Sequence, residues 1–348
     1  MSTQLELLET IRSLTDVYGV SGDEFGVSAV AAELLKPYVD KVEIDKLGNV
    51  IGYRSCGKPG AKKLMLDAHL DQIGFMITQI TEEGFCRFIG MGVDQRMLLG
   101  SELTVLTKEG PAPAVVCCLP PHIQNPGDNK KSVPIDEMAL DLGLDGKQAK
   151  ELVRIGDYAA FSEEAFALQN DLLCGKSMDD RACFVCILLA LEALQGQELD
   201  VDLIILGSTK EEVGGHGARA RAFADRPDYA IAIDVCHAKT ADSKPGDRVS
   251  DLGGGPVIAF GSNSVPRFAR RLTEIARAKE IPYQTEAVPA HSGTNAWAIQ
   301  TEEGGVCTAV VSLPLKYMHS PVEVLKQSDM RQVGRLLCEF VRSFDGTL

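Results

Sequence analysis

Four short, nearly continuous apolar runs along the chain each lead to an acidic or imidazole side chain. They are rich in aliphatic residues, as in Leu-Ile-Ile-Leu at 203–206 and Tyr-Ala-Ile-Ala-Ile at 229–233. Runs of this kind are typical of strands that are buried on both faces of a parallel or mixed sheet. The runs and the polar residues after them are 64–66 with His69, 203–206 with Glu211 and Glu212, 229–233 with Asp234, and 310–313 with His319.

These polar side chains are expected to meet at one edge of the sheet. In open α/β sheets, ligands bind just beyond the carboxyl ends of the strands. A fifth candidate, Asp179, belongs to the sequence Asp179-Asp180-Arg181, which opens a helix predicted to begin near Arg181. Two neutral imidazoles and three carboxylates suit zinc or a similar divalent ion, and their number suits two ions rather than one. The pattern therefore predicts a dinuclear metal site in a hydrolase.

The first part of the chain is predicted to be helical. Apolar residues recur at helical spacing from Leu5 to Leu14. The sequence Ser21-Gly22-Asp23-Glu24 offers a capping box for a second helix that carries apolar residues between 27 and 35. Residues 42–44 and 50–53 flank a turn signal and predict a hairpin.

From residue 73 to about residue 164 the pattern changes to short strands separated by turns. This pattern predicts a small β-barrel, and the segment 120–131 is predicted to be an exposed loop. The βα alternation resumes after Gly175, so candidate ligands occur on both sides of the β segment. The expected fold is a mixed-sheet α/β/α domain formed by residues 1–72 and 165–348, with residues 73–164 inserted as a β domain.

Composition narrows the function classes. The formal net charge is −14, which argues against a nucleic-acid partner because there is no basic field to replace the counterions on phosphates. No apolar stretch reaches the roughly 20 residues that span a bilayer, and the N-terminus lacks the pattern of a signal peptide. Ten cysteines occur, many within apolar runs, and buried reduced thiols favour a cytoplasmic location.

Each motif also has an ordinary structural interpretation. A histidine at a strand end is often a satisfied structural residue, but Asp71 follows His69 on the same face of an extended segment and could orient a metal-bound imidazole. The pair Asp179-Asp180 could simply cap a helix. The adjacent carboxylates Glu211 and Glu212 repel each other unless a cation or proton intervenes, so one could bind a metal while the other accepts a proton from water.

Taken together, the motifs resemble those of the tetrahedral (TET) aminopeptidases, also called glutamyl aminopeptidases, which are dinuclear-zinc exopeptidases. The similarity extends over essentially the whole chain, and the motifs occur in the family's order. They are Ala68-His69-Leu70-Asp71-Gln72-Ile73-Gly74-Phe75, Lys176-Ser177-Met178-Asp179-Asp180-Arg181, Lys210-Glu211-Glu212-Val213-Gly214, Ile233-Asp234-Val235, Ser292-Gly293-Thr294-Asn295-Ala296 and Tyr317-Met318-His319-Ser320-Pro321-Val322-Glu323.

The resemblance implies a role for each site residue. His69 and His319 would bind one ion each, Asp179 would bridge the two ions, and the remaining ligands would be Glu212 and Asp234. The implied cofactors are two divalent ions per subunit, with zinc expected first and cobalt as an alternative. The general base would be Glu211, and Asp71 would orient His69.

The resemblance also implies the architecture and the partners. The inserted domain would be PDZ-like and would mediate dimerisation, dimers would assemble into a dodecamer, and short peptides would be the substrates.

The chain departs from the family pattern at Gln72, Asn295 and Lys316, where Glu, Asp and often Arg are usual. These departures are expected to affect the substrate pocket and not the hydrolytic centre. Lys316 could pair with an acidic substrate side chain, or it could be a solvated lysine.

Three rival functions remain open. The first is a dinuclear deacylase or carboxypeptidase on a related scaffold. The second is a glycosidase, because family members sometimes carry the name endoglucanase and paired carboxylates also suit sugar chemistry. The third is a scaffold protein with a decayed site.

Overall fold

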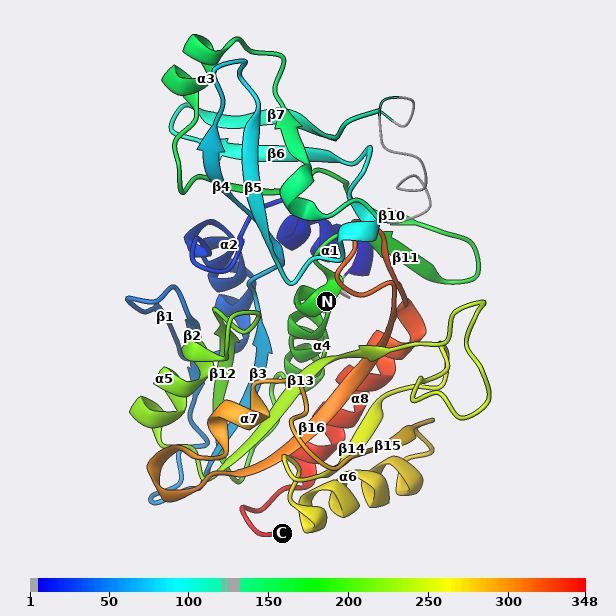
Figure 1. The fold of residues 1–348 in the computed structure, drawn as a ribbon. Helices are drawn as coiled ribbons and strands as arrows, with labels where there is room; N and C mark the ends of the chain where they lie inside the picture. Colours follow the sequence, from blue (N-terminus) through cyan, green and yellow to red (C-terminus); the bar gives the residue numbers. More distant parts are fainter. Residues whose placement is uncertain (1–5, 121–122, 124–131) are drawn as a thin grey trace.

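The computed structural model describes residues 6–120, 123 and 132–348. It consists of a large mixed sheet with helices on both faces and a small closed β-barrel at one end (Figure 1). The helices are α1 (Leu7–Thr15), α2 (Phe25–Leu35), α3 (Gly146–Leu152), α4 (Met178–Ala193), α5 (His216–Asp225), α6 (Pro266–Ala278), α7 (Ala296–Ile299) and α8 (Gln327–Ser343).

The large sheet is built from strands before and after the barrel in the sequence. Along its main path the order is β1 (Lys41–Ile44), β2 (Val50–Arg54), β12 (Asp202–Ser208), β3 (Lys63–His69), β13 (Tyr229–His237), β16 (Cys307–Lys316), β17 (Glu323–Lys326), β11 (Leu172–Gly175) and β10 (Phe166–Ala167). Beside β16 lies β14 (Val257–Gly261), which also pairs with β15 (Gln284–Val288).

The four central strands β12, β3, β13 and β16 are mutually parallel. Their carboxyl ends therefore lie at the same edge of the sheet, as the apolar runs predict. The register places Ser208 opposite His69 and Asp234 opposite Ser312. Helices α1, α2, α4, α6 and α8 contribute to the main hydrophobic core, while α5 contacts β12 and α7 contacts β13 and β16.

One buried cation holds the sheet edge to the helices. Arg181, in the first turn of α4, is fully buried. Its guanidinium donates hydrogen bonds to the carbonyl oxygens of Leu70 (2.9 Å), Leu14 (2.7 Å) and Val17 (2.7 Å). The start of α4, where Asp179 and Asp180 lie, is thereby fixed against α1 and the end of β3.

The barrel has its own core. Its strands, in spatial order, are β4 (Gly74–Ile80), β5 (Cys86–Met91), β8 (Ala139–Asp141), β7 (Gly110–Cys117), β6 (Glu102–Thr107) and β9 (Tyr158–Phe161). The ring of Phe75 packs edge-on against Phe88 and Phe161, with ring centroids 5.4 Å apart in each pair. The predicted fold class, a mixed α/β sheet combined with a small β-barrel, is confirmed.

Of the predictions for local structure, one is confirmed and one is wrong. The hairpin is confirmed, since β1 and β2 pair antiparallel. The capping box is wrong: α2 begins at Phe25 with no side-chain cap, because Ser21 Oγ instead donates to Asp71 Oδ2 at 2.6 Å. Most of the predicted loop 120–131 lies outside the described residues. Among the residues described, no helix is both long and apolar enough to cross a membrane.

Candidate metal centre

The structure brings the five predicted metal ligands together from five separate elements. His69 is the last residue of β3, Asp179 precedes the regular part of α4, and Asp234 lies in β13. Glu212 and His319 come from the loops after β12 and β16. Unlike the prediction, β13 does not end at Asp234 but continues to His237.

Asp179 lies between the two imidazoles. Its Oδ1 is 3.1 Å from His69 Nε2, and its Oδ2 is 3.4 Å from His319 Nε2. The same nitrogen of His319 is 3.4 Å from Glu212 Oε2. A carboxylate with one oxygen toward each imidazole has the arrangement of a ligand that can bridge two ions.

Two groups of side chains in the described part of the chain present ligand atoms that all lie within 4.8 Å of one another. One group is His69, Asp179 and Glu212, and the other is His69, Asp180 and Asp234. The sequence predicts Asp180 only as a support for its neighbour Asp179. The structure instead brings its fully buried carboxylate into the cluster, where Oδ2 also accepts a hydrogen bond from the backbone N–H of His69 at 3.1 Å.

The electrostatic environment of the cluster favours the binding of cations. Burial raises the pKa of Glu212 to about 8, and the charge of Asp179 adds to the rise. Burial also raises the pKa of Asp234 well above its ordinary value, with Asp180 adding to it. A buried carboxylate surrounded by like charges needs a proton or a cation, and Glu212 Oε1 is buried with no hydrogen-bond partner in the described structure. Imidazole and carboxylate donors of this kind suit zinc or a similar divalent ion.

Asp71 holds the centre together without belonging to either group of ligand atoms. It is fully buried, and its Oδ1 accepts the backbone N–H of Glu211 at 3.0 Å. Its Oδ2 accepts the N–H of Glu212 at 3.2 Å and the hydroxyl of Ser21. Its Oδ1 also lies 3.4 Å from His69 Nδ1. One carboxylate thus positions the acidic pair and faces the ring nitrogen of His69 that points away from Asp179.

We expect Asp71→Asn to weaken metal affinity or turnover by roughly 10- to 100-fold, the usual cost of losing a group that orients a metal ligand. A carboxylate has two acceptor oxygens, one for each backbone N–H group. The asparagine side chain has only one acceptor oxygen, and its NH₂ group cannot accept the second hydrogen bond. Ser21→Ala is the matched control, because it removes one donor and leaves the carboxylate, and it should cost far less. Metal content and turnover measured on both variants check this. Equal effects in the two variants would contradict the positioning role.

A second positioning carboxylate was not identified from the sequence. Glu323, the first residue of β17, is buried; its Oε1 accepts the N–H of His319 at 3.0 Å and its Oε2 that of Asp179 at 3.1 Å. It therefore joins two of the elements that supply ligands. The only sequence signal was the position of Glu323 within the motif around His319, which does not indicate whether its carboxylate faces the site.

The barrel also reaches the centre. Gly92, just after β5, has a φ of +73°, and a Cβ there would lie 2.6 Å from Ile73 Cγ2 and 3.4 Å from Glu212 Oε2. The same Cβ would lie 3.6 Å from His319 Nδ1. Only glycine fits this approach, so the loop after β5 forms a wall of the metal centre.

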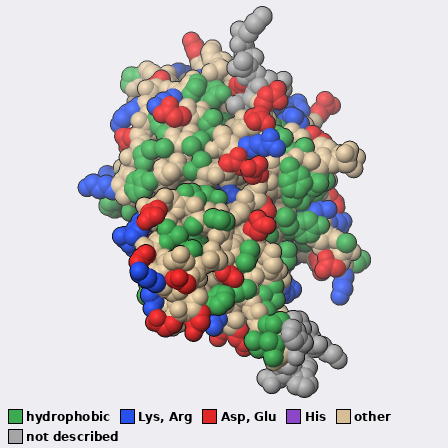
Figure 2. Space-filling view, turned by 90° about the horizontal axis from the view of Figure 1, so that it is seen from above, with side chains coloured by type: hydrophobic (Ala, Val, Ile, Leu, Met, Phe, Trp, Pro, Cys, Tyr) green, Lys and Arg blue, Asp and Glu red, His purple; other side chains and the backbone are tan. Residues whose placement is uncertain are grey.

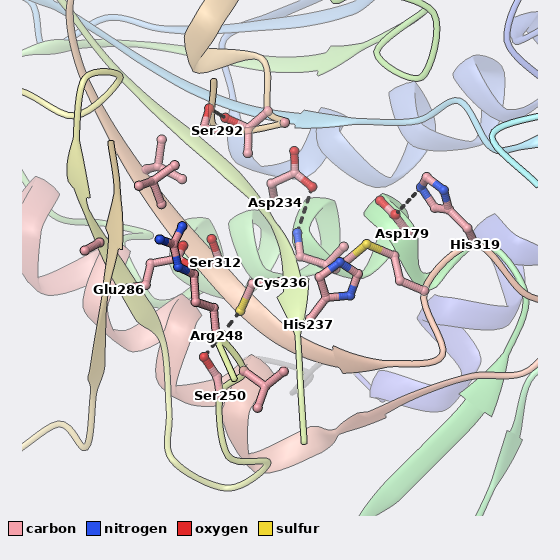
Figure 3. Close-up of a pocket in the computed structure, with 18 of the residues that line it drawn as sticks. Asp179, Asp234, Cys236, His237, Arg248, Ser250, Glu286, Ser292, Ser312 and His319 are labelled. Carbon is pink, nitrogen blue, oxygen red and sulfur yellow. Dashed lines mark hydrogen bonds and ion pairs between the residues drawn. The ribbon is translucent and has the colours of Figure 1, made fainter. Parts of the chain in front are cut away.

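A cavity of about 680 Å³ opens beside the cluster and is lined by His69, Asp179, Glu211, Glu212, Asp234 and His319, among others. Figure 3 shows the cavity with Asp179 and His319 at one side and Glu286, Arg248 and Ser250 at the other. Its walls come from β13, β15, β16 and the loops around them.

The three departures from the family pattern do not line this cavity as far as the structure describes it. Gln72 Oε1 accepts from Ser177 Oγ at 2.7 Å, and Asn295 Nδ2 donates to Ser208 Oγ at 2.8 Å. Lys316 is the last residue of β16. Their effect on the substrate pocket therefore stays a prediction. The buried amide of Gln72 connects the segment after β3 to the start of α4, and that of Asn295 connects the start of α7 to the end of β12.

Comparisons with known proteins agree with the fold. The lysyl aminopeptidase of Pyrococcus furiosus is 35% identical over 347 residues, which cover 97% of this chain and 99% of that protein. The solved structure of aminopeptidase APDkam598 from Desulfurococcus kamchatkensis matches with a TM-score of 0.91 and 35% identity over 97% of this chain and 95% of that one.

A solved structure of the Pyrococcus horikoshii TET1 peptidase, described as able to assemble into a tetrahedron or a large octahedral shell, matches with a TM-score of 0.85 and 30% identity, covering 97% of this chain and all (100%) of that chain. The model of the M42 glutamyl aminopeptidase family matches residues 48–336. With most of its length matched, this chain belongs to the M42 glutamyl aminopeptidase family of peptide hydrolases.

Proposed function

We propose that this chain removes single residues from the free N-terminus of short peptides with two divalent ions per subunit and Glu211 as the general base. The observation that carries the proposal is the position of Glu211. It lines the cavity directly beside the ligand cluster, and Asp71 fixes its backbone. Burial raises the pKa of Glu211 to about 7, and the charges of Asp71 and Asp179 contribute to the rise. A carboxylate with this pKa can both accept and return a proton near neutral pH.

The proposed ligands are His69, Asp179 and Asp234 for one ion and Asp179, Glu212 and His319 for the other. When bound, the ions would polarise the scissile carbonyl, lower the pKa of water and hold the substrate's free α-amino group. The oxygen atoms of Glu211 would take a proton from the attacking water and then pass it to the leaving amine. Asp71 and Glu323 would keep the ligand-bearing loops in place during this transfer.

The aminopeptidase and deacylase hypotheses predict opposite results on one pair of substrates. We expect peptides with a free N-terminus to be cleaved and their N-acetylated counterparts not to be cleaved, because a neutral amide cannot replace the amine as a ligand. Product release measured by chromatography on matched peptides checks this. Cleavage of both at equal rates would favour the deacylase. Sugar release from cellulose would favour the glycosidase.

We also propose self-association through the barrel, with assembly to a dodecamer, and a cytoplasmic location. The barrel exposes apolar side chains such as Ile89 (50% exposed) and Val115 (46%). Figure 2 shows the barrel end of the molecule, where hydrophobic side chains lie between charged ones at the surface. All ten cysteines are free, which suits a reducing compartment. Light scattering that finds only a monomer in the metal-loaded protein would refute the assembly.

A further inference from the structure

The M42 family is named for glutamyl residues, whereas the similar enzyme of Pyrococcus furiosus is named for lysyl residues, so members of one family are named for opposite charges. The residues that line the cavity indicate which N-terminal residue is preferred. Within the proposed function, the question is which side chain of the first substrate residue the cavity accepts. The sheet register shows which wall residues face the metal cluster.

The register brings one further carboxylate to the face of the sheet that bears Asp234. Asp234 on β13 pairs with Ser312 on β16, and Ser312 pairs with Val257 on β14. Two residues along β14, Ala259 pairs with Glu286 on β15. Since paired residues, and residues two apart, point to the same face, the side chain of Glu286 points to the same side as that of Asp234.

Contacts place the end of that side chain near the cluster. The hydroxyl of Ser312 is close enough to the Glu286 carboxylate to lower the pKa of that group. Ser312 lies one strand away from Asp234, a separation of about 4.8 Å in a sheet. Both Glu286 and Ser312 line the cavity that holds the metal cluster, as Figure 3 shows. The first substrate residue would have its amino group at the cluster, so a long side chain, and not a short one, could reach Glu286.

The charge of Glu286 is not neutralised by the protein. In the described part of the chain it forms no ion pair with a lysine, arginine or histidine, although it is only partly exposed. Burial raises the pKa of its carboxyl group, an effect that the nearby Ser312 hydroxyl offsets in part. A half-buried carboxylate without a cation is a site that a cation from the substrate can complete.

We propose that Glu286 determines substrate choice by forming an ion pair with the side chain of an N-terminal lysine or arginine. The competing cation in the cavity wall is Arg248, which would favour acidic residues instead. Arg248 lies on an exposed loop next to Asp247, whose opposite charge also faces the cavity. Its charge is screened by solvent more strongly than that of Glu286. Glu286, the more buried of these two charged groups, therefore determines the preference for the first substrate residue.

The experiment compares lysyl-, leucyl- and glutamyl-anilides on the metal-loaded protein and three variants. We expect wild type to prefer the lysyl substrate in kcat/KM, and Glu286→Gln to lower the lysyl-to-leucyl ratio by about 10- to 100-fold, the range for one charge-assisted contact. Glu286→Asp keeps the charge and should retain part of the preference. Glu109→Gln, the same chemical change at an exposed turn of the barrel, should leave the ratio within about threefold of wild type, as expected for a screened exposed charge.

Three results would overturn the inference. These are a wild-type preference for glutamyl or leucyl substrate, an equal fall on the lysyl and leucyl substrates in Glu286→Gln, and an equal loss of the ratio in Glu109→Gln. Each of them leaves the aminopeptidase proposal standing, provided that the leucyl substrate is hydrolysed. Failure to hydrolyse any of the three free-amine substrates would instead refute the proposed function on which this inference rests.

Discussion

Glu211→Gln is expected to lower turnover by about two to four orders of magnitude, the usual loss when a general base is removed. Glutamine keeps the shape of the side chain and the backbone N–H that donates to Asp71, so the loop and the metal ligands stay in place. The amide cannot accept a proton from water. Metal content should therefore remain close to that of wild type while turnover falls.

The matched control is Glu109→Gln, which makes the same chemical change at an exposed turn of the barrel. It should leave both turnover and metal content unchanged. Steady-state turnover and elemental analysis on the same samples separate the two effects. Unchanged turnover in Glu211→Gln would remove this residue from the mechanism, and loss of metal would make it a ligand.

Glu212→Ala is expected to lose bound metal and to lower turnover by more than about 100-fold. Removing a group that only orients a metal ligand already lowers metal affinity or activity by roughly 10- to 100-fold, so removing a ligand itself should lower them further. The change removes a carboxylate whose Oε2 lies 3.4 Å from His319 Nε2. Its backbone N–H bond to Asp71 is kept, so the effect is confined to the side chain.

Stripped of metal, Glu212→Ala should be no less stable than the stripped wild type, since burial and Asp179 already disfavour the charged form of Glu212. Thermal unfolding with and without metal checks this. A variant that retains its full metal content would show that Glu212 is not a ligand.

The sheet and the approximate place of the site followed from the sequence because buried parallel strands leave a clear pattern. Apolar runs ended near His69 and before Glu211, and the parallel register brings their ends together. The strand containing Asp234 was predicted too short, because Val235 and Cys236 beyond it are also suited to a strand. The spacing of the apolar residues predicts that a strand is present, but it does not predict the residue at which the strand ends.

Apart from Asp71, the supports of the site could not be predicted, because they depend on unusual backbone geometry and on long-range contacts. Ser177, Lys210, Tyr317 and His319 all have φ values between 56° and 62°. Non-glycine residues seldom adopt this left-handed conformation, and it is enriched at functional sites. None of these residues carries a turn signal in the sequence. The burial of Glu323 and Asp180 likewise arises only when distant segments meet.

The position of Glu286 in the cavity wall could not be predicted from the sequence, for a different reason. In β15 the burial alternates between partly buried and exposed residues, so the segment gives no strong apolar pattern, and Glu286 looks like any solvated acid. Its position depends on a register that passes through β14 and β16. Such a relation among three strands has no local signature.

The central claim, that two bound ions per subunit enable Glu211 to assist hydrolysis at a free N-terminus, is tested most directly by one titration. Protein stripped of metal is loaded stepwise with zinc, and separately with cobalt, while bound metal and turnover of a free-amine substrate are measured on each sample. Turnover should be absent in the stripped protein and should reach its plateau at two bound ions per subunit. Full turnover in the stripped protein, or a plateau at one ion, would contradict the claim.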